Sequence, residues 1–230
     1  MAKFYITTPI YYVNAPPHLG HAYTDIAVDV IARWHRGRGD ETFFLTGTDE
    51  HGAKIARSAL RAGIPTADFV TGYREAFKKL LKTLNASNDG FIYTADREHH
   101  WHGVEKIWKA LETSGDLYKA IYKGLYCVGH EAFVTEKDLV GGVCADHNQK
   151  PEVIEEENYF FRLSKYIPRV IEVIEKDEYC IEPAARKNEV LAFLRGPVED
   201  ISFSRPARDI SWGIPVPGDP EHMVYVWADA

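Results

Sequence analysis

The chain has 230 residues, of which 45% are hydrophobic and 27% charged, and its formal net charge is −7. These values are typical of a globular protein with one large or two small domains, and they exclude a uniformly basic nucleic-acid-binding surface. The sequence contains no long apolar run and no signal-peptide pattern at its start. It therefore predicts no membrane span and a cytoplasmic location, with no disulfide framework among the three cysteines.

The first predicted elements are a short apolar strand over residues 4–8 and a long helix over residues 21–36. The helix carries apolar residues at helical spacing, which form one stripe. The stripe consists of Ala22, Ile26, Ala27, Val30, Ile31 and Trp34. The string His18-Leu19-Gly20-His21 stands where the strand hands over to the helix.

The start of this helix is a candidate phosphate site. A helix N-terminus presents free backbone N–H groups and partial positive charge, which suit a polyphosphate. Gly20 allows a ligand to approach the backbone closely, and the rings of His18 and His21 can donate hydrogen bonds to phosphate oxygens. The alternative is that both histidines cap the helix or lie solvated in a loop.

Further strands and helices alternate along the first half of the chain, which predicts a doubly wound parallel α/β sheet. These elements are a strand at 42–46, helices at 52–62 and 67–84, a strand at 91–94 and a helix at 97–113. From residue 116 to 160 the sequence contains Gly, Cys and His residues and short predicted strands, with little helical periodicity. This change indicates an inserted module. Helices at 164–176 and 184–194, a loop-like tail and a strand at 224–227 follow. The predicted domain boundaries give a first α/β portion at 1–115, an insertion at 116–221 and a strand in 222–230 that returns to the first portion.

Two C-x-x-H pairs in the module, Cys127 with His130 and Cys144 with His147, form a candidate metal site. Thiolate and imidazole ligands on two tight turns suit tetrahedral structural Zn²⁺, which would also help so polar a segment to fold. The alternative is two buried thiols and two surface histidines. Cys180 stands alone and is predicted to be a core thiol.

The opening Tyr5–Asn14, followed by His18–His21, resembles the start of methionyl-tRNA synthetases, and later strings agree in the same order. These strings are Thr46–Gly52, Glu157–Arg162, Ser202–Pro206, Trp212–Pro215 and Tyr225–Ala230. The resemblance implies the first half of a Rossmann-type catalytic domain, with a connective insertion that carries a zinc knuckle at 122–150.

The resemblance also implies an activity and a set of site residues. ATP, with Mg²⁺, would activate methionine to methionyl-adenylate, and the aminoacyl group would pass to the 3′ end of the methionine tRNA. The implied ATP-binding residues are His18, Gly20 and His21, with both histidines catalytic. The implied methionine-binding residues are Ile10, Tyr12, Asp49, Trp227 and Ala230, and the implied zinc ligands are Cys127, His130, Cys144 and His147.

Each methionine-site residue also has a plain structural interpretation. Asp49 could cap the helix at 52–62, and the large apolar side chains of Ile10, Tyr12 and Trp227 could simply belong to the core. His130 stands where the family commonly has a cysteine, and Ala228 where it often has a larger side chain.

The family's lysine-rich second signature loop, the second half of its sheet and its anticodon-binding domain are absent. We therefore expect the chain to be the N-terminal portion of a larger enzyme, and to form adenylate poorly on its own. The alternatives are an inactive truncated paralogue that binds tRNA or a partner, a synthetase for another aliphatic amino acid, and a nucleotidyltransferase of coenzyme synthesis. No DNA partner is expected, and the oligomeric state stays open.

Overall fold

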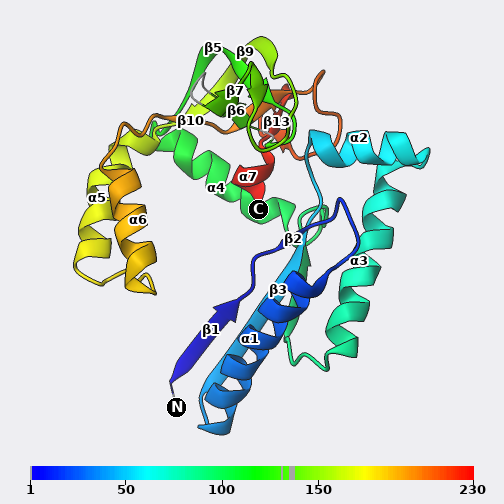
Figure 1. The fold of residues 1–230 in the computed structure, drawn as a ribbon, viewed down its shortest axis with the longest axis vertical. Helices are drawn as coiled ribbons and strands as arrows, with labels where there is room; N and C mark the ends of the chain where they lie inside the picture. Colours follow the sequence, from blue (N-terminus) through cyan, green and yellow to red (C-terminus); the bar gives the residue numbers. More distant parts are fainter. Residues whose placement is uncertain (1, 131, 135–137) are drawn as a thin grey trace.

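The computed structural model describes residues 2–130, 132–134 and 138–230, and its N-terminal part is a parallel sheet with flanking helices (Figure 1). The central strand β3 pairs in parallel with β1 and β2 along one edge and with β4 along the other. The predicted βαβ unit and the strand at 91–94 are confirmed. The elements are β1 (Lys3–Thr7), β2 (Tyr11–Tyr12), α1 (Leu19–Gly37), β3 (Glu41–Asp49) and β4 (Gly90–Tyr93).

Three more helices follow the strands and confirm the periodicity of the sequence. They are α2 (Ala53–Ala62), α3 (Thr66–Thr83) and α4 (Trp101–Thr113). The main core forms where α2 and α3 meet the turn after β2, through Val13, Ile55, Val70 and Phe77, which are all at most 1% exposed. This core lies directly behind the start of α1, because the ring of Phe77 contacts the ring of His21.

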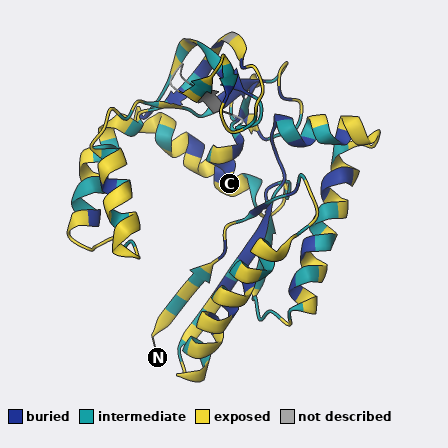
Figure 2. Ribbon diagram, viewed as in Figure 1, coloured by how far each residue is buried: buried dark blue, intermediate teal, exposed yellow. Residues whose placement is uncertain are grey.

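The apolar stripe predicted on α1 faces outward rather than into a core (Figure 2). Ile26, Val30 and Trp34 are 49%, 61% and 55% exposed, whereas Asp25 and Asp29 are buried. The physical reason is that both carboxylates have partners. The Tyr11 hydroxyl donates to Asp25 at 2.7 Å, and the backbone N–H and hydroxyl of Ser87 both donate to Asp29. Paired carboxylates can be buried, and sequence periodicity does not report such long-range partners.

The middle of the chain is an antiparallel sheet built on two long strands, where the sequence predicted short ones. β5 (Leu117–Cys127) pairs with β9 (Glu152–Phe161) along ten residue pairs, and β6 (Ala132–Val134) and β10 (Ile201–Ser202) flank them. A small hairpin, β7 (Leu139–Val140) with β8 (Val143–Cys144), completes the module.

The two helices predicted after this sheet are present as α5 (Leu163–Glu175) and α6 (Ala184–Leu194). They form an antiparallel pair that projects away from the rest of the molecule (Figure 1). Cys180 lies between them and is exposed, so the prediction of a core thiol is wrong. Among the described residues, none of the helices combines the length and the apolar composition that a bilayer-spanning segment requires.

The last residues form a second antiparallel sheet and a short helix, which corrects the predicted strand at 224–227. The elements are β11 (Ser204–Pro206), β12 (Pro215–Val216), β13 (Asp219–Val224) and α7 (Val226–Asp229). β13 pairs with β11 and β12, so residues 222–230 return no strand to the parallel sheet. The backbone turns into α7 because the carbonyl of Tyr225 accepts hydrogen bonds from the N–H groups of Ala228 and Asp229.

Candidate functional site

The start of α1 is organised by its two histidines. His18 is the N-cap residue, and its Nδ1 accepts a hydrogen bond from the backbone N–H of Gly20 at 3.1 Å. The Nδ1 of His21 accepts one from the backbone N–H of His18 at 3.0 Å, and the two ring centroids are 3.9 Å apart. Both histidines therefore make the capping hydrogen bonds that the alternative interpretation predicted. These bonds also determine which ring nitrogen is available to donate to a ligand.

A neutral imidazole whose Nδ1 accepts a hydrogen bond carries its proton on Nε2. The caps thus set the same tautomer in His18 and His21, with an Nε2–H available as a donor. Burial, and then the neighbouring His18, lower the pKa of His21, so its ring is neutral at pH 7. The result is a neutral His21 ring with its Nε2–H free to donate, beside the capping ring of His18, at a helix N-terminus whose backbone suits an anion.

A cavity of 360 Å³ lies at the carboxyl ends of β2 and β3 and is closed on one side by α7. Its volume falls in the ordinary range for small-molecule sites. All five residues of the predicted methionine site line it: Ile10, Tyr12, Asp49, Trp227 and Ala230. Trp227 is 73% exposed, so the alternative that it is a core residue fails for this side chain.

Asp49 is the last residue of β3 and does not cap the following helix. α2 begins after Gly52, and its start has no side-chain cap. The hydroxyl of Thr94 lies 3.5 Å from Asp49 Oδ1, while the next residue, Glu50, points into the interior. The strand end therefore presents a partly exposed carboxylate to the cavity.

The cavity also has walls that the sequence reasoning missed. Lys54 lies on the first turn of α2, and its Nζ lies 5.8 Å from the centre of the Tyr12 ring. Gly129 and His130 come from the candidate metal module, and Pro9 and Val226 adjoin predicted residues. Of these residues, Pro9 and Val226 could have been found from the sequence, because they are immediate neighbours of Ile10 and Trp227.

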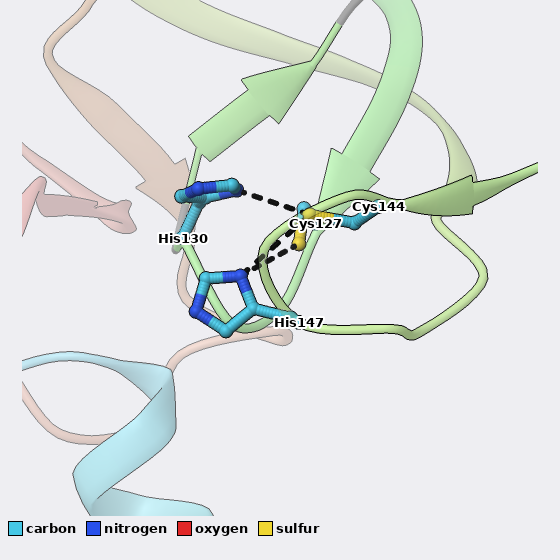
Figure 3. A group of neighbouring side chains, drawn as sticks. All are labelled: Cys127, His130, Cys144 and His147. Atoms are coloured by element: carbon cyan, nitrogen blue, oxygen red, sulfur yellow. Dashed lines mark hydrogen bonds between the residues drawn. The ribbon is translucent and has the colours of Figure 1, made fainter. Parts of the chain in front are cut away.

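The four predicted metal ligands lie together (Figure 3). Their ligand atoms are all within 4.8 Å of one another, and both cysteines are buried. The Sγ of Cys144 lies 3.5 Å from Nδ1 of His130 and 3.6 Å from Nδ1 of His147, and the Sγ of Cys127 lies 3.8 Å from Nδ1 of His147.

These separations fit a tetrahedral ion. Zn–S bonds of about 2.3 Å and Zn–N bonds of about 2.0 Å at the tetrahedral angle place sulfur and nitrogen about 3.5 Å apart. Nε2 of His130 lies 3.0 Å from Asp146 Oδ2, a carboxylate contact of the kind that orients metal-binding histidines. Gly129 is required here, because a Cβ would lie 2.3 Å from the ring of His147.

The parallel α/β sheet and its inserted module belong to the fold of the class I aminoacyl-tRNA synthetases. The chain belongs to the family described as "tRNA synthetases class I (M)", whose profile matches residues 4–148 and 134–230. Methionine–tRNA ligases are its relatives: that of Thermotoga maritima is 46% identical and that of Brucella suis 44% identical, each over 99% of this chain.

Solved structures agree with the sequence comparison. Mycobacterium tuberculosis methionyl-tRNA synthetase in complex with methionyl-adenylate superposes with a TM-score of 0.93 at 40% identity, over 100% of this chain and 45% of that one. The free-state structure of that enzyme has a TM-score of 0.81. The chain spans 36% of the Thermotoga relative and 44% of the Brucella relative.

Proposed function

We propose that the chain supplies the methionine-binding and ATP-binding part of a methionine–tRNA ligase. The observation that carries this proposal is the single cavity lined by all five residues expected to hold methionine. ATP, methionine and the methionine tRNA are accordingly the proposed substrates, with Mg²⁺ accompanying ATP.

In the proposed first step, a carboxylate oxygen of methionine forms a bond to the α-phosphorus of ATP. The bond to the bridging oxygen breaks, and pyrophosphate leaves. His18 and His21 contribute Nε2–H donors to the phosphate oxygens, and Gly20 leaves their approach to the helix start open. This is electrostatic stabilisation by groups already held in place by the cap, and no side chain acts as a nucleophile.

In the proposed methionine site, Asp49 receives the ammonium group through a charge-assisted contact. Ile10, Tyr12, Trp227 and Ala230 surround the thioether, a polarizable group that packs well against aromatic rings. A ribose hydroxyl of the 3′-terminal adenosine of the tRNA then forms an ester bond with the aminoacyl group, while the acyl–phosphate bond breaks and AMP leaves.

We propose that Cys127, His130, Cys144 and His147 hold a structural Zn²⁺. Four protein ligands close the coordination sphere, so the ion would stabilise the module rather than bind substrate. Asp146 would fix the orientation of the His130 ring through Nε2.

The experiment is calorimetric titration of the purified chain with methionine, and then with leucine. Asp49→Asn should weaken methionine binding about 10- to 100-fold, since a hydrogen bond to a charged group contributes about 1.5–3 kcal/mol. Asp68→Asn is the matched control, because Asp68 carries the same charge on the exposed first turn of α3. It should bind methionine as the parent chain does.

Equal binding of leucine and methionine would overturn the methionine assignment. Unchanged affinity in Asp49→Asn would remove that residue from the ammonium site. Retained tRNA binding in a chain that binds no methionine would instead support the docking-module alternative.

A further inference from the structure

The cavity has two walls that come from opposite ends of the chain. Ile10, Tyr12 and Asp49 lie at the ends of β2 and β3, whereas Trp227 and Ala230 lie on or just after α7. α7 has only four residues, and no helix of that length is stable by its own backbone hydrogen bonds. Something in the tertiary structure must therefore fix its distance from β3.

One buried contact joins the two walls. Nδ1 of His51 lies 2.5 Å from Oδ2 of Asp229, and their side chains are 2% and 0% exposed. His51 follows Asp49 by two residues, and Asp229 lies between Trp227 and Ala230. Each partner is thus within two residues of a proposed methionine-binding residue.

The surroundings hold this pair in place from other elements. Nε2 of His100, at the start of α4, lies 2.6 Å from the backbone carbonyl oxygen of Asp229, and α7 lies beside α4 (Figure 1). The ring of His51 also packs edge-on against Trp101 and Trp212. Trp212 is tied back to the β3 loop, because its Nε1–H donates to the carbonyl of Glu50 at 2.6 Å.

We infer that the His51–Asp229 hydrogen bond is the positioning contact that sets the spacing between Asp49 and the Trp227 wall of the cavity. The identity of the ligand, methionine, rests on the proposed function, whereas the contact itself rests on the geometry alone. His51 donates from Nδ1 to the Asp229 carboxylate, and neither residue lines the cavity. Both are therefore positioning residues rather than residues that touch substrate.

The contact is costly to maintain, which argues against a merely incidental role. Oδ1 of Asp229 is buried and makes no hydrogen bond to the part of the chain that the structure describes. Burial raises the pKa of the Asp229 carboxyl, and His51 and His100 oppose that shift. A buried carboxylate with one unpaired oxygen carries a desolvation cost, and such costs are kept at positions where a specific geometry depends on them.

The test compares Asp229→Asn with Asp116→Asn in the 230-residue chain. Asp116 is a second buried aspartate whose contacts, with Ser114, Lys165 and Tyr166, lie outside the cavity. Two quantities are measured: the Kd for methionine by calorimetry, and the exchange rate of the Ala228 amide by NMR. The Ala228 amide donates to the Tyr225 carbonyl and so reports the integrity of α7.

We expect Asp229→Asn to raise the methionine Kd about tenfold and to speed exchange at Ala228 about tenfold, with neither change in Asp116→Asn. Unchanged exchange at Ala228 in a folded Asp229→Asn chain overturns the inference, and so does an equal effect of both variants.

If the parent chain binds no methionine, the proposed function fails, and the exchange comparison alone decides the contact. If Asp229→Asn does not fold, His51→Gln takes its place. In the parent chain, an imidazole nitrogen spectrum that shows Nδ1 of His51 without a proton also overturns the inference.

Discussion

The buried ion pair behind Asp49 allows a quantitative prediction. Arg74 of α3 donates from Nε to Oε1 of Glu50 at 2.6 Å and from Nη2 to Oε2 at 2.5 Å. The Glu50 side chain is 0% exposed and that of Arg74 is 14% exposed. The hydroxyl of Thr48 donates to the same carboxylate at 2.7 Å. The pair is therefore bidentate and shielded from water, the geometry in which removal of one partner costs most.

In Arg74→Met, the Glu50 carboxylate stays buried and keeps the hydrogen bond from the Thr48 hydroxyl, but it loses its positively charged partner. We expect the free energy of unfolding to fall by about 3–5 kcal/mol, which is a large fraction of the about 5–15 kcal/mol that holds a typical domain. The double variant Glu50→Met with Arg74→Met removes both charges and keeps similar volume. It should recover most of the loss, because replacing a whole buried pair by apolar groups is often close to neutral.

The assay is urea unfolding followed by circular dichroism, with Lys78→Met as the control. Lys78 lies on the same helix and pairs with Glu75 on the surface at 2.9 Å, so its loss should cost less than about 1 kcal/mol. An Arg74→Met chain no less stable than the control would refute the reasoning. A double variant less stable than Arg74→Met alone would refute it equally.

Two further predictions concern the insertion. Hydrogen bonds from Lys165, Ser114 and Tyr166 hold the pKa of Asp116 well below its usual range. Since the unfolded chain binds this proton first, Asp116 stabilises the fold above about pH 4 and loses that contribution as the pH falls further. Urea unfolding of Asp116→Asn should accordingly depend less on pH in the acid range than unfolding of the parent chain does. Mass spectrometry of the dialysed parent chain should find about one zinc ion, as a closed four-ligand site implies, and Cys144→Ser should retain much less. A metal-free parent chain would contradict the zinc proposal.

The sequence by itself determined the local elements and selected residues that line the cavity. Apolar spacing placed α1, α2, α3 and the strands β1, β3 and β4 within a few residues, since these signals depend only on neighbours along the chain. The motif strings also selected five residues that line one cavity, although Ile10 and Trp227 are more than two hundred positions apart. The C-x-x-H spacing likewise selected four side chains that meet.

Tertiary structure alone decided which face of α1 is buried and how the two walls of the cavity meet. Asp25 and Asp29 took the inner face of α1 because Tyr11 and Ser87 donate hydrogen bonds to them, a pairing that no local period encodes. Residues 226–229 turned into a helix instead of extending β13, and the His51–Asp229 contact links positions 178 residues apart. Long-range hydrogen bonds between buried polar groups outweigh local preference because an unpaired group in the interior loses its water and gains nothing in return.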